Sequence, residues 1–405
     1  MAEDLAESRA RISAAPHRRI SPRLANGRKL FITVHRTIGL FLGAIYVLIG
    51  ISGSILAFGQ SIDEALNASI MRVEAPGVAA AYRPLDEILA AAKAAAPPGS
   101  MPERLKMPRH AGLAVAITIL VPTDDLDMDS IELFVDPYKA EITGQRLLLH
   151  QDDVFAQPFI NIVRDFHWTL LLGPQRAYLL GIVAILMSFS LLIGVYLWWP
   201  RNGNWRHALT IKWNATPERL TYDVHKTLGL YLGFLLIVSL ATGIAMIYKP
   251  QTRAIVGQFS VLRPEAQNQR STAIAGQRPL GLDAAAAIAD KVFPDGRLHW
   301  VLLPGGSEGV YVIGKQAEDE PNQASTNRNV TIDQFSGNIL HVQDRRNFTA
   351  GETFLEWLYP LHCGEAFGNI GRALVLMLGI VPLLLYVTGF LRWRQKRRLS
   401  RCGRP

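Results

Sequence analysis

The chain has 405 residues, of which 49% are hydrophobic and 19% charged, and its formal net charge is +8. This composition excludes intrinsic disorder. The mean hydropathy of +0.15 is too apolar for an ordinary soluble enzyme and too polar for a transporter that is helical throughout, so it favours a few membrane spans joined to soluble domains.

Positive charge gathers in three clusters, each beside a hydrophobic run, at residues 9–29, 201–226 and 392–404. The positive-inside rule places such clusters in the cytoplasm. None of them interleaves stacking aromatic residues with a base-reading fold, so nucleic acid is not a predicted partner. Two cysteines are too few for a disulfide framework, a cysteine-rich zinc site or an iron–sulfur cluster.

Four apolar runs are long enough to cross a hydrocarbon core of roughly 30 Å. In chain order we predict a cytoplasmic basic tail (1–29), a first span (30–58), a periplasmic α+β domain (59–161), an interfacial helix with the second span (162–200), a cytoplasmic loop (201–224), a third span (225–248), a second periplasmic α+β domain (249–358), an interfacial segment with the fourth span (359–393) and a cytoplasmic basic tail (394–405). The predicted fold class is a membrane all-α core of four helices with two periplasmic α+β domains. Both termini would lie in the cytoplasm, and the membrane would be a bacterial inner membrane.

The two halves of the chain resemble one another, which indicates two tandem repeats. The segment His35-Arg-Thr-Ile-Gly-Leu-Phe-Leu-Gly at the first span recurs 190 residues later as His225-Lys-Thr-Leu-Gly-Leu-Tyr-Leu-Gly. His167 before the second span and His362 before the fourth are 195 residues apart. The predicted topology puts His35 and His225 (the inner pair) at the cytoplasmic side and His167 and His362 (the outer pair) at the periplasmic side.

Two facing histidines can ligate a haem iron from both sides. If the repeats pack about a pseudo-twofold axis, each pair meets across it, so the sequence predicts two b-type haem groups. They would be held without covalent attachment, because no C-x-x-C-H segment occurs. Two histidine ligands leave no open iron position, which disfavours oxygen binding.

Each inner histidine is followed by glycines at four-residue intervals, which share its helical face. A flat macrocycle needs such a smooth groove, although glycines also serve close helix packing in lipid. The predicted groove residues are Gly39, Gly43, Gly229 and Gly233.

Arginines and tryptophans accompany the outer pair. Arg176 and Arg372 stand where they would bind haem propionates or anchor the chain at the membrane interface. Trp168 and Trp357 would lie at the outer haem edge or belong to aromatic belts. No catalytic side chain is predicted beyond this edge.

These motifs resemble the PepSY-associated transmembrane family and, within it, the FoxB-type inner-membrane ferric-siderophore reductases. The resemblance rests on residues 35–40, 225–230, 167–176 and 361–372, and on a strand-turn-strand element in each outer segment. It implies a four-helix membrane core, two periplasmic PepSY domains, two b-type haems and a part in iron acquisition.

The predicted function is transmembrane electron transfer that reduces a ferric siderophore at the periplasmic face, with a membrane quinol or a cytoplasmic reductant as donor. One alternative is a haem-free anchor whose PepSY domains bind or inhibit a peptidase. Another is a haem or metal permease, which we disfavour because the sequence predicts four spans, no inverted repeat and no broken helix within a span.

Overall fold

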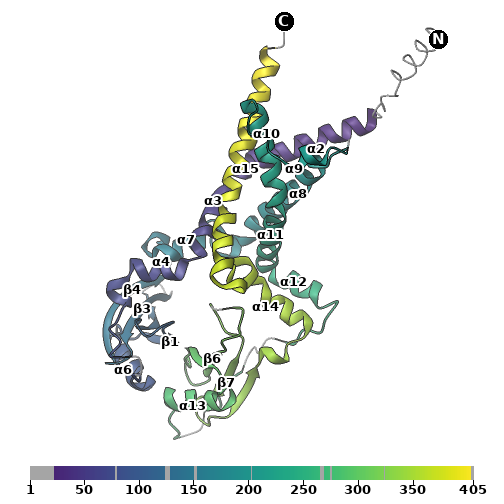
Figure 1. Cartoon of the computed structure of the whole chain (residues 1–405). Helices are drawn as coiled ribbons and strands as arrows, with labels where there is room; N and C mark the ends of the chain where they lie inside the picture. Colours follow the sequence, from purple (N-terminus) through teal and green to yellow (C-terminus); the bar gives the residue numbers. More distant parts are fainter. Residues whose placement is uncertain are drawn as a thin grey trace, which may run out of the picture.

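The computed structural model describes residues 22–77, 80–123, 128–149, 153–201, 203–264, 269–273, 276–322 and 324–402. Most of the predicted basic tail at 1–29, and the end of the one at 394–405, lie outside these residues. Long helices rise from one side of a large sheet, and α15 runs to the end of the molecule that is remote from the sheet (Figure 1). We call the two ends of the molecule the sheet end and the remote end.

The described residues contain four long helical segments, two of which consist of two consecutive helices. They are α2 (Pro22–Phe41) continued by α3 (Gly43–Leu56), α8 (Ala177–Trp198), α10 (Pro217–Tyr231) continued by α11 (Gly233–Ile247), and α15 (Gly368–Cys402). Two stretches, Phe159–Trp198 and Glu365–Arg398, are long and apolar enough to cross a membrane. The pairs α2 with α3 and α10 with α11 pass the same test only together, so the described residues hold up to four candidate spans.

In both pairs, α2 with α3 and α10 with α11, the chain bends by 54° between the two helices. The expectation of unbroken helices in every span is therefore wrong for the first and third. The bends lie where Gly43 and Gly233 begin the second helix, and glycine is a common site of sharp kinks. At the first bend a Cβ on Gly43 would lie 2.8 Å from the ring of Tyr386 on α15, so glycine also admits a close neighbour there.

Helical structure extends past the predicted spans at the remote end. Helix α2 begins at Pro22 rather than at residue 30, and α10 begins at Pro217, where the hydroxyl of Thr216 accepts a hydrogen bond from the Arg219 amide. Helix α15 continues to Cys402. Hydropathy marks only the apolar part of a helix, whereas arginine, lysine and leucine continue it readily into a polar region.

Short helices connect the long ones to the sheet. They are α4 (Gly59–Leu66), α5 (Ala68–Met71), α7 (Phe159–Thr169), α9 (Trp205–Leu209), α12 (Lys249–Val256) and α14 (Ala350–Cys363), with 3₁₀ turns at Val154–Ala156, Pro174–Arg176, Arg345–Asn347 and Glu365–Phe367. Helix α7 lies where the sequence predicts a short helix before the second span. Its counterpart α14 begins at Ala350, earlier than the predicted boundary at 359.

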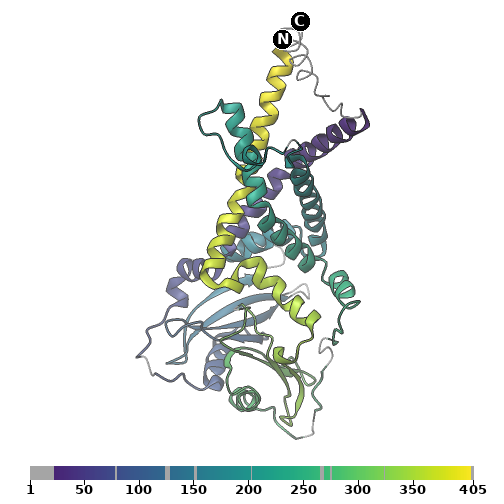
Figure 2. The same ribbon diagram turned by 45° about the vertical axis from the view of Figure 1, so that its right-hand side comes forward.

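The segments 59–161 and 249–358, which we call the outer segments, are predicted from the sequence to be two separate domains. Their strands form one antiparallel sheet instead. Its strands are β1 (Met101–Lys106), β2 (Val115–Pro122), β3 (Met128–Asp136), β4 (Glu141–Leu149), β5 (Arg297–Leu302), β6 (Val310–Gln316), β7 (Asn329–Asp333) and β8 (Ile339–Gln343). The strand order is β4-β3-β2-β1-β5-β6-β7-β8, and Leu105 of β1 pairs with Val301 of β5. Figure 2 shows the two halves side by side below the helices. Each half has the predicted helix and antiparallel strands, but joining β1 to β5 protects an edge that each would otherwise expose.

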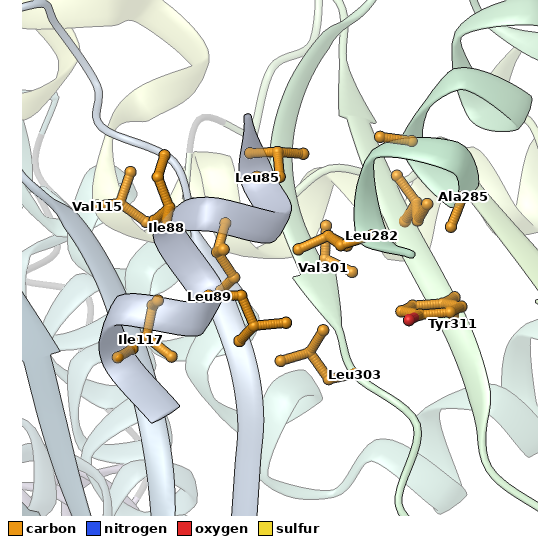
Figure 3. Close-up of a cluster of buried hydrophobic side chains, with 14 of the residues drawn as sticks. Leu85, Ile88, Leu89, Val115, Ile117, Leu282, Ala285, Val301, Leu303 and Tyr311 are labelled. Atoms are coloured by element: carbon orange, nitrogen blue, oxygen red, sulfur yellow. The ribbon is translucent and has the colours of Figure 1, made fainter. Parts of the chain in front are cut away.

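One hydrophobic core serves both halves of the sheet. Val115, Ile117 and Ile119 alternate along β2 and are fully buried, as expected for a strand with one face on a core. Helices α6 (Leu85–Ala95) and α13 (Leu282–Val292) cover this face on the side away from the long helices (Figure 1). Leu89 and Leu282 belong to the same cluster, whose side chains from the two halves meet in Figure 3.

The N-termini of α6 and α13 cap one another across the two repeats. Asp283 accepts hydrogen bonds from the amides of Leu85 and Asp86 at 2.8 and 3.0 Å. Asp86 accepts from the amides of Leu282 and Asp283 at 2.7 and 3.2 Å. Each carboxylate thus satisfies amides that a helix start leaves without partners.

We expect Asp86→Ala to lower the midpoint of thermal unfolding of the sheet, because a lost N-terminal cap costs roughly 0.5–2 kcal/mol. Asp86→Asn is the comparison variant and should lower the midpoint less, since its one amide oxygen still accepts one of the two hydrogen bonds. Thermal scans of both variants in detergent test this. Equal midpoints for the two would contradict the reciprocal capping.

Candidate functional site

The inner pair comes together at the remote end. His35 lies on α2 and His225 on α10, and their ring centroids are 6.2 Å apart. These helices come from different repeats, so the pair meets across the interface between the halves, as the sequence predicts.

The outer pair comes together beside the sheet. His167 lies near the C-terminus of α7 and His362 near that of α14, with ring centroids 6.1 Å apart. The four histidines thus form two pairs, and the helices α2 and α10 of the inner pair lie farther from the sheet than α7 and α14 of the outer pair (Figure 1).

Neighbouring helices fix the Nδ1 atom of every histidine in these pairs. Nδ1 of His35 lies 2.9 Å from the carbonyl oxygen of Ser190, and Nδ1 of His225 lies 2.9 Å from the hydroxyl of Thr388 and bonds the carbonyl of Leu385. A carbonyl oxygen only accepts, so Nδ1 carries the proton. This tautomer leaves the Nε2 lone pair of both rings available to a metal.

The outer pair has the same arrangement. Nδ1 of His167 lies 3.1 Å from the carbonyl oxygen of Ile49 and 3.0 Å from the hydroxyl of Ser52. Nδ1 of His362 lies 3.0 Å from the carbonyl oxygen of Ser239 and from the hydroxyl of Thr242. Both rings are therefore oriented by α3 and α11, which belong to their own repeats.

A glycine packs against the Cε1 atom of each of the four rings. A Cβ added to the glycine would lie 2.9–3.3 Å from that atom, closer than side chains normally approach. The four are Gly194 against His35, Gly389 against His225, Gly53 against His167, and Gly243 against His362. Glycine at these positions lets the supporting helix come close enough for its carbonyl to bond Nδ1.

The sequence analysis missed these supporting residues, although the duplication marks them. Ser52-Gly53 and Thr242-Gly243 are 190 residues apart, and Gly194 and Gly389 are 195 apart. These are the offsets that relate the histidines themselves. Residues that orient a ligand repeat with it, because the support is needed wherever the ligand is.

The inner pair opens into a cavity of about 460 Å³, a size typical of cofactor pockets. Its wall is mainly apolar, from side chains such as Ile32, Met187 and Leu240, while several basic residues also line it. The cavity lies between helices of the two repeats. It can hold a flat apolar molecule beside the two imidazoles.

Three of the four predicted groove glycines line this cavity. Gly39, Gly43 and Gly229 do so, and a Cβ on Gly39 would meet nothing within 4 Å. Gly233 is not among the residues that line this cavity, although Gly43, which follows the same 54° bend in the first repeat, is. The role of Gly233 beside a haem stays a prediction.

The two predicted propionate-binding arginines differ in their surroundings. Nη2 of Arg372 donates to Oε1 of Glu365 at 3.1 Å, so a carboxylate already neutralises it. Arg176 is exposed and donates to the carbonyl of Leu172 at 3.3 Å. Of the tryptophans, Trp168 is partly exposed and donates to Asp165, and Trp357 is half-buried on α14. The roles of these residues at an outer haem stay predictions.

The spacing of the two imidazoles in each pair fits a metal ion between them, and the inner pair also has a cavity beside it. A metal ion at about 2.0 Å from each of two opposed Nε2 atoms places the ring centroids roughly 6.3 Å apart, close to the 6.2 and 6.1 Å of the two pairs. Within the described residues, histidine, cysteine, aspartate and glutamate do not gather in groups of three or more that would hold a bare ion. Two imidazoles alone suit a metal whose remaining ligands come from a macrocycle.

Helix α14, which carries His362, is held at its start by a charged network. Thr349 and Glu352 form a capping box, and Glu352 also pairs with Arg263 at 2.6 Å. These hydrogen bonds from Arg263 lower the pKa of Glu352 to about 2. A glutamate whose pKa falls on folding stabilises the folded state above its ordinary pKa and loses that effect as pH falls toward the folded value.

We expect Glu352→Gln to lower the thermal unfolding midpoint by a constant amount from pH 7 to about 5. The difference from the wild-type chain should then shrink as pH falls toward 3, because protonated glutamate resembles glutamine. Glu318→Gln, on an exposed loop, is the control. A difference that does not change with pH would show that the charge of Glu352 contributes nothing to the fold.

Comparisons with known proteins address the family. A search of curated proteins found none that matches the chain. The family model described as the PepSY-associated TM region matches residues 32–396, which include both histidine pairs, the helices that support them and the whole sheet. The chain therefore belongs to the family of membrane proteins with a PepSY-associated TM region.

Proposed function

We propose that this protein is a di-haem membrane oxidoreductase that reduces a ferric siderophore and so releases Fe(II). The observation that carries the proposal is the presence of two histidine pairs, one at each end of the helical region, with centroid separations of 6.2 and 6.1 Å. A chain that only anchors a binding domain has no need for either pair.

When bound, the two haem groups would supply one-electron transfer. The chain's own part is to hold them: Nε2 of His35 and His225 would ligate one, and Nε2 of His167 and His362 the other. The carbonyls that bond Nδ1 keep each ring in the ligating tautomer. The wall around the inner pair is mainly apolar, which suits the apolar faces of a macrocycle.

The chemistry of the substrate follows from the preference of iron for its ligands. Fe(III) is a hard ion held tightly by the oxygen donors of a siderophore, and the addition of one electron gives Fe(II), which those donors hold far less well. A membrane quinol or a cytoplasmic reductant would supply the electron. The outer pair lies beside the sheet, so the ferric chelate would be reduced at the sheet end.

The proposed setting is a bacterial inner membrane, with the sheet in the periplasm and both termini in the cytoplasm. Arg28, Lys226 and Arg392 line the cavity of the inner pair, the pair farther from the sheet, and the positive-inside rule assigns such a basic side to the cytoplasm. The two outer segments would be the periplasmic PepSY domains, joined into one sheet.

The test is an anaerobic reoxidation experiment. Purified protein reduced with dithionite should reoxidise when a ferric siderophore is added, while Fe(II) appears in a ferrozine trap. The Ga(III) complex of the same siderophore is the control, because it has a similar shape and charge but does not accept the electron. Reduced protein that reoxidises with a quinone but with no ferric chelate would contradict siderophore reduction.

A permease is the second candidate, and the bends in the first and third spans favour it. Broken helices line the substrate sites of many transporters, and the inner cavity lies beside both bends. The two functions differ in how haem is held. Isotopically labelled haem added to the purified protein should exchange slowly with the bound haem of a reductase and rapidly with the cargo of a permease.

A further inference from the structure

Five basic residues line the cavity of the inner pair: Arg28, Arg36, Lys226, Arg392 and Lys396. Among the described residues, the cavity lining contains no aspartate or glutamate. Uncompensated positive charge beside an apolar cavity is unfavourable unless an anion enters it.

Two of the five are occupied by groups of the chain. Nη2 of Arg28 donates to the carbonyl of Leu197 at 3.1 Å. Lys226 is paired with Asp223 at 3.0 Å and bonds the carbonyl of His207. Both side chains hold neighbouring helices together, and the carboxylate of Asp223 also neutralises Lys226.

The other three are available to a ligand. Arg36 and Lys396 are exposed and have no carboxylate partner within the described chain. Arg392 is held by uncharged groups, with its guanidinium 5.0 Å from the centre of the Tyr222 ring and 3.5 Å from the carbonyl of Glu218. Lys396 lies close enough to Arg392 and Arg36 for their charges to repel its own.

Two of these cations, Arg392 and Lys396, lie on α15, the helix that also supports His225 of the inner pair. Leu385 and Gly389 support His225, and Arg392 and Lys396 follow roughly one and two turns beyond Gly389 toward the remote end. These four residues are spaced by three or four positions, so they share one face of the helix. A molecule held by His35 and His225 would therefore present its remote edge to the cations.

The repeats differ at this point. The residues that lie 195 positions before Arg392 and Lys396 are Leu197, which is apolar, and Arg201, which bonds the hydroxyl of Tyr196 and does not line the cavity. The histidines, the supporting glycines and the basic residue after each inner histidine (Arg36 and Lys226) are duplicated, but Arg392 and Lys396 have no basic counterpart that lines the cavity in the first repeat.

We infer that Arg36, Arg392 and Lys396 bind the two carboxylates of the inner macrocycle and direct them toward the remote end. The inference rests on the proposed function and adds to it the residues that recognise and orient the cofactor. Haem b carries two carboxylates on one edge, so a basic edge on one side of the cavity selects a single orientation. These are positioning residues, not iron ligands.

The experiment uses the full chain with His362→Ala, which leaves only the inner site for haem. Haem b and its dimethyl ester, whose carboxylates are blocked, are titrated into the apoprotein and followed by the Soret band. We expect this protein to prefer haem b by on the order of tenfold or more, because charge-assisted hydrogen bonds are strong. Adding Arg36→Gln, Arg392→Gln and Lys396→Gln should abolish the preference, and Arg201→Gln should retain it.

A second readout is the midpoint potential of the inner haem in the same background. Nearby cations disfavour the extra positive charge of the ferric form, so their removal should lower the potential. A triple variant that prefers haem b as strongly as its parent would overturn the inference and leave the proposed function intact. Binding of neither porphyrin to the parent protein would overturn both.

The same three cations would also attract a lipid phosphate. Nanodiscs of phosphatidylglycerol or phosphatidylcholine separate the two sources. If the triple variant keeps its preference for haem b but loses bound phosphatidylglycerol, the cations bind lipid and the inference is wrong.

Discussion

His225→Ala should remove one haem group from the purified protein and leave the other. Loss of an axial ligand breaks the site to which that ligand belongs, and the two pairs lie at different levels of the helical region. His35→Ala should remove the same haem as His225→Ala, while His167→Ala and His362→Ala should both remove the second. The two haems can be distinguished by their midpoint potentials and low-spin signals.

His341→Ala is the control, because this histidine lies on β8 within the sheet and should leave both haems in place. The pairing fails if His35→Ala and His225→Ala affect different haems. It also fails if either one affects the same haem as His167→Ala.

The second large effect is expected from a change that touches no ligand. Gly53→Ala would place a methyl group 2.9 Å from Cε1 of His167, while Ser52 and Ile49 hold Nδ1 of the same ring. The ring must move, and with it the Nε2 atom that would ligate the outer haem. We expect the outer haem to bind on the order of tenfold more weakly or to lose its low-spin signal, because supporting contacts at metal sites typically have effects of this size.

Gly27→Ala is the matched control. It is the same substitution within a helix, but its new Cβ would have nothing within 4 Å, and Gly27 lies on α2, away from the helices that orient the outer pair. Haem titration of both variants tests the prediction. If Gly53→Ala and Gly27→Ala retain the outer haem equally well, the glycine support has no role in holding the ligand.

Apolar runs and duplication predict much of the fold. They place the candidate spans and the helix with antiparallel strands in each outer segment, since burial in lipid or in a core leaves a regular pattern in the sequence. The pairing of β1 with β5 leaves no pattern in the sequence, because the hydrogen bonds between these two strands join backbone groups. The bends before Gly43 and Gly233 are hidden for a similar reason, as glycine fits a straight helix or a kink.

For the candidate site, the repeat offsets identify all four histidines and their pairing. The same offsets also contain Ser52, Gly53, Thr242 and Gly243, but small residues in an apolar helix have an ordinary packing role, and only the ring of a histidine against them reveals another. The pairing of Arg372 with Glu365 depends on the turn at Gly364 and could not be inferred from spacing.

The most direct test of the account is the haem content of the full chain, purified in detergent from cells supplied with iron. The pyridine haemochrome assay should give about two b-type haems per chain, both with the low-spin spectrum of two histidine ligands. A value near zero would contradict the central claim and leave the histidine pairs without a cofactor.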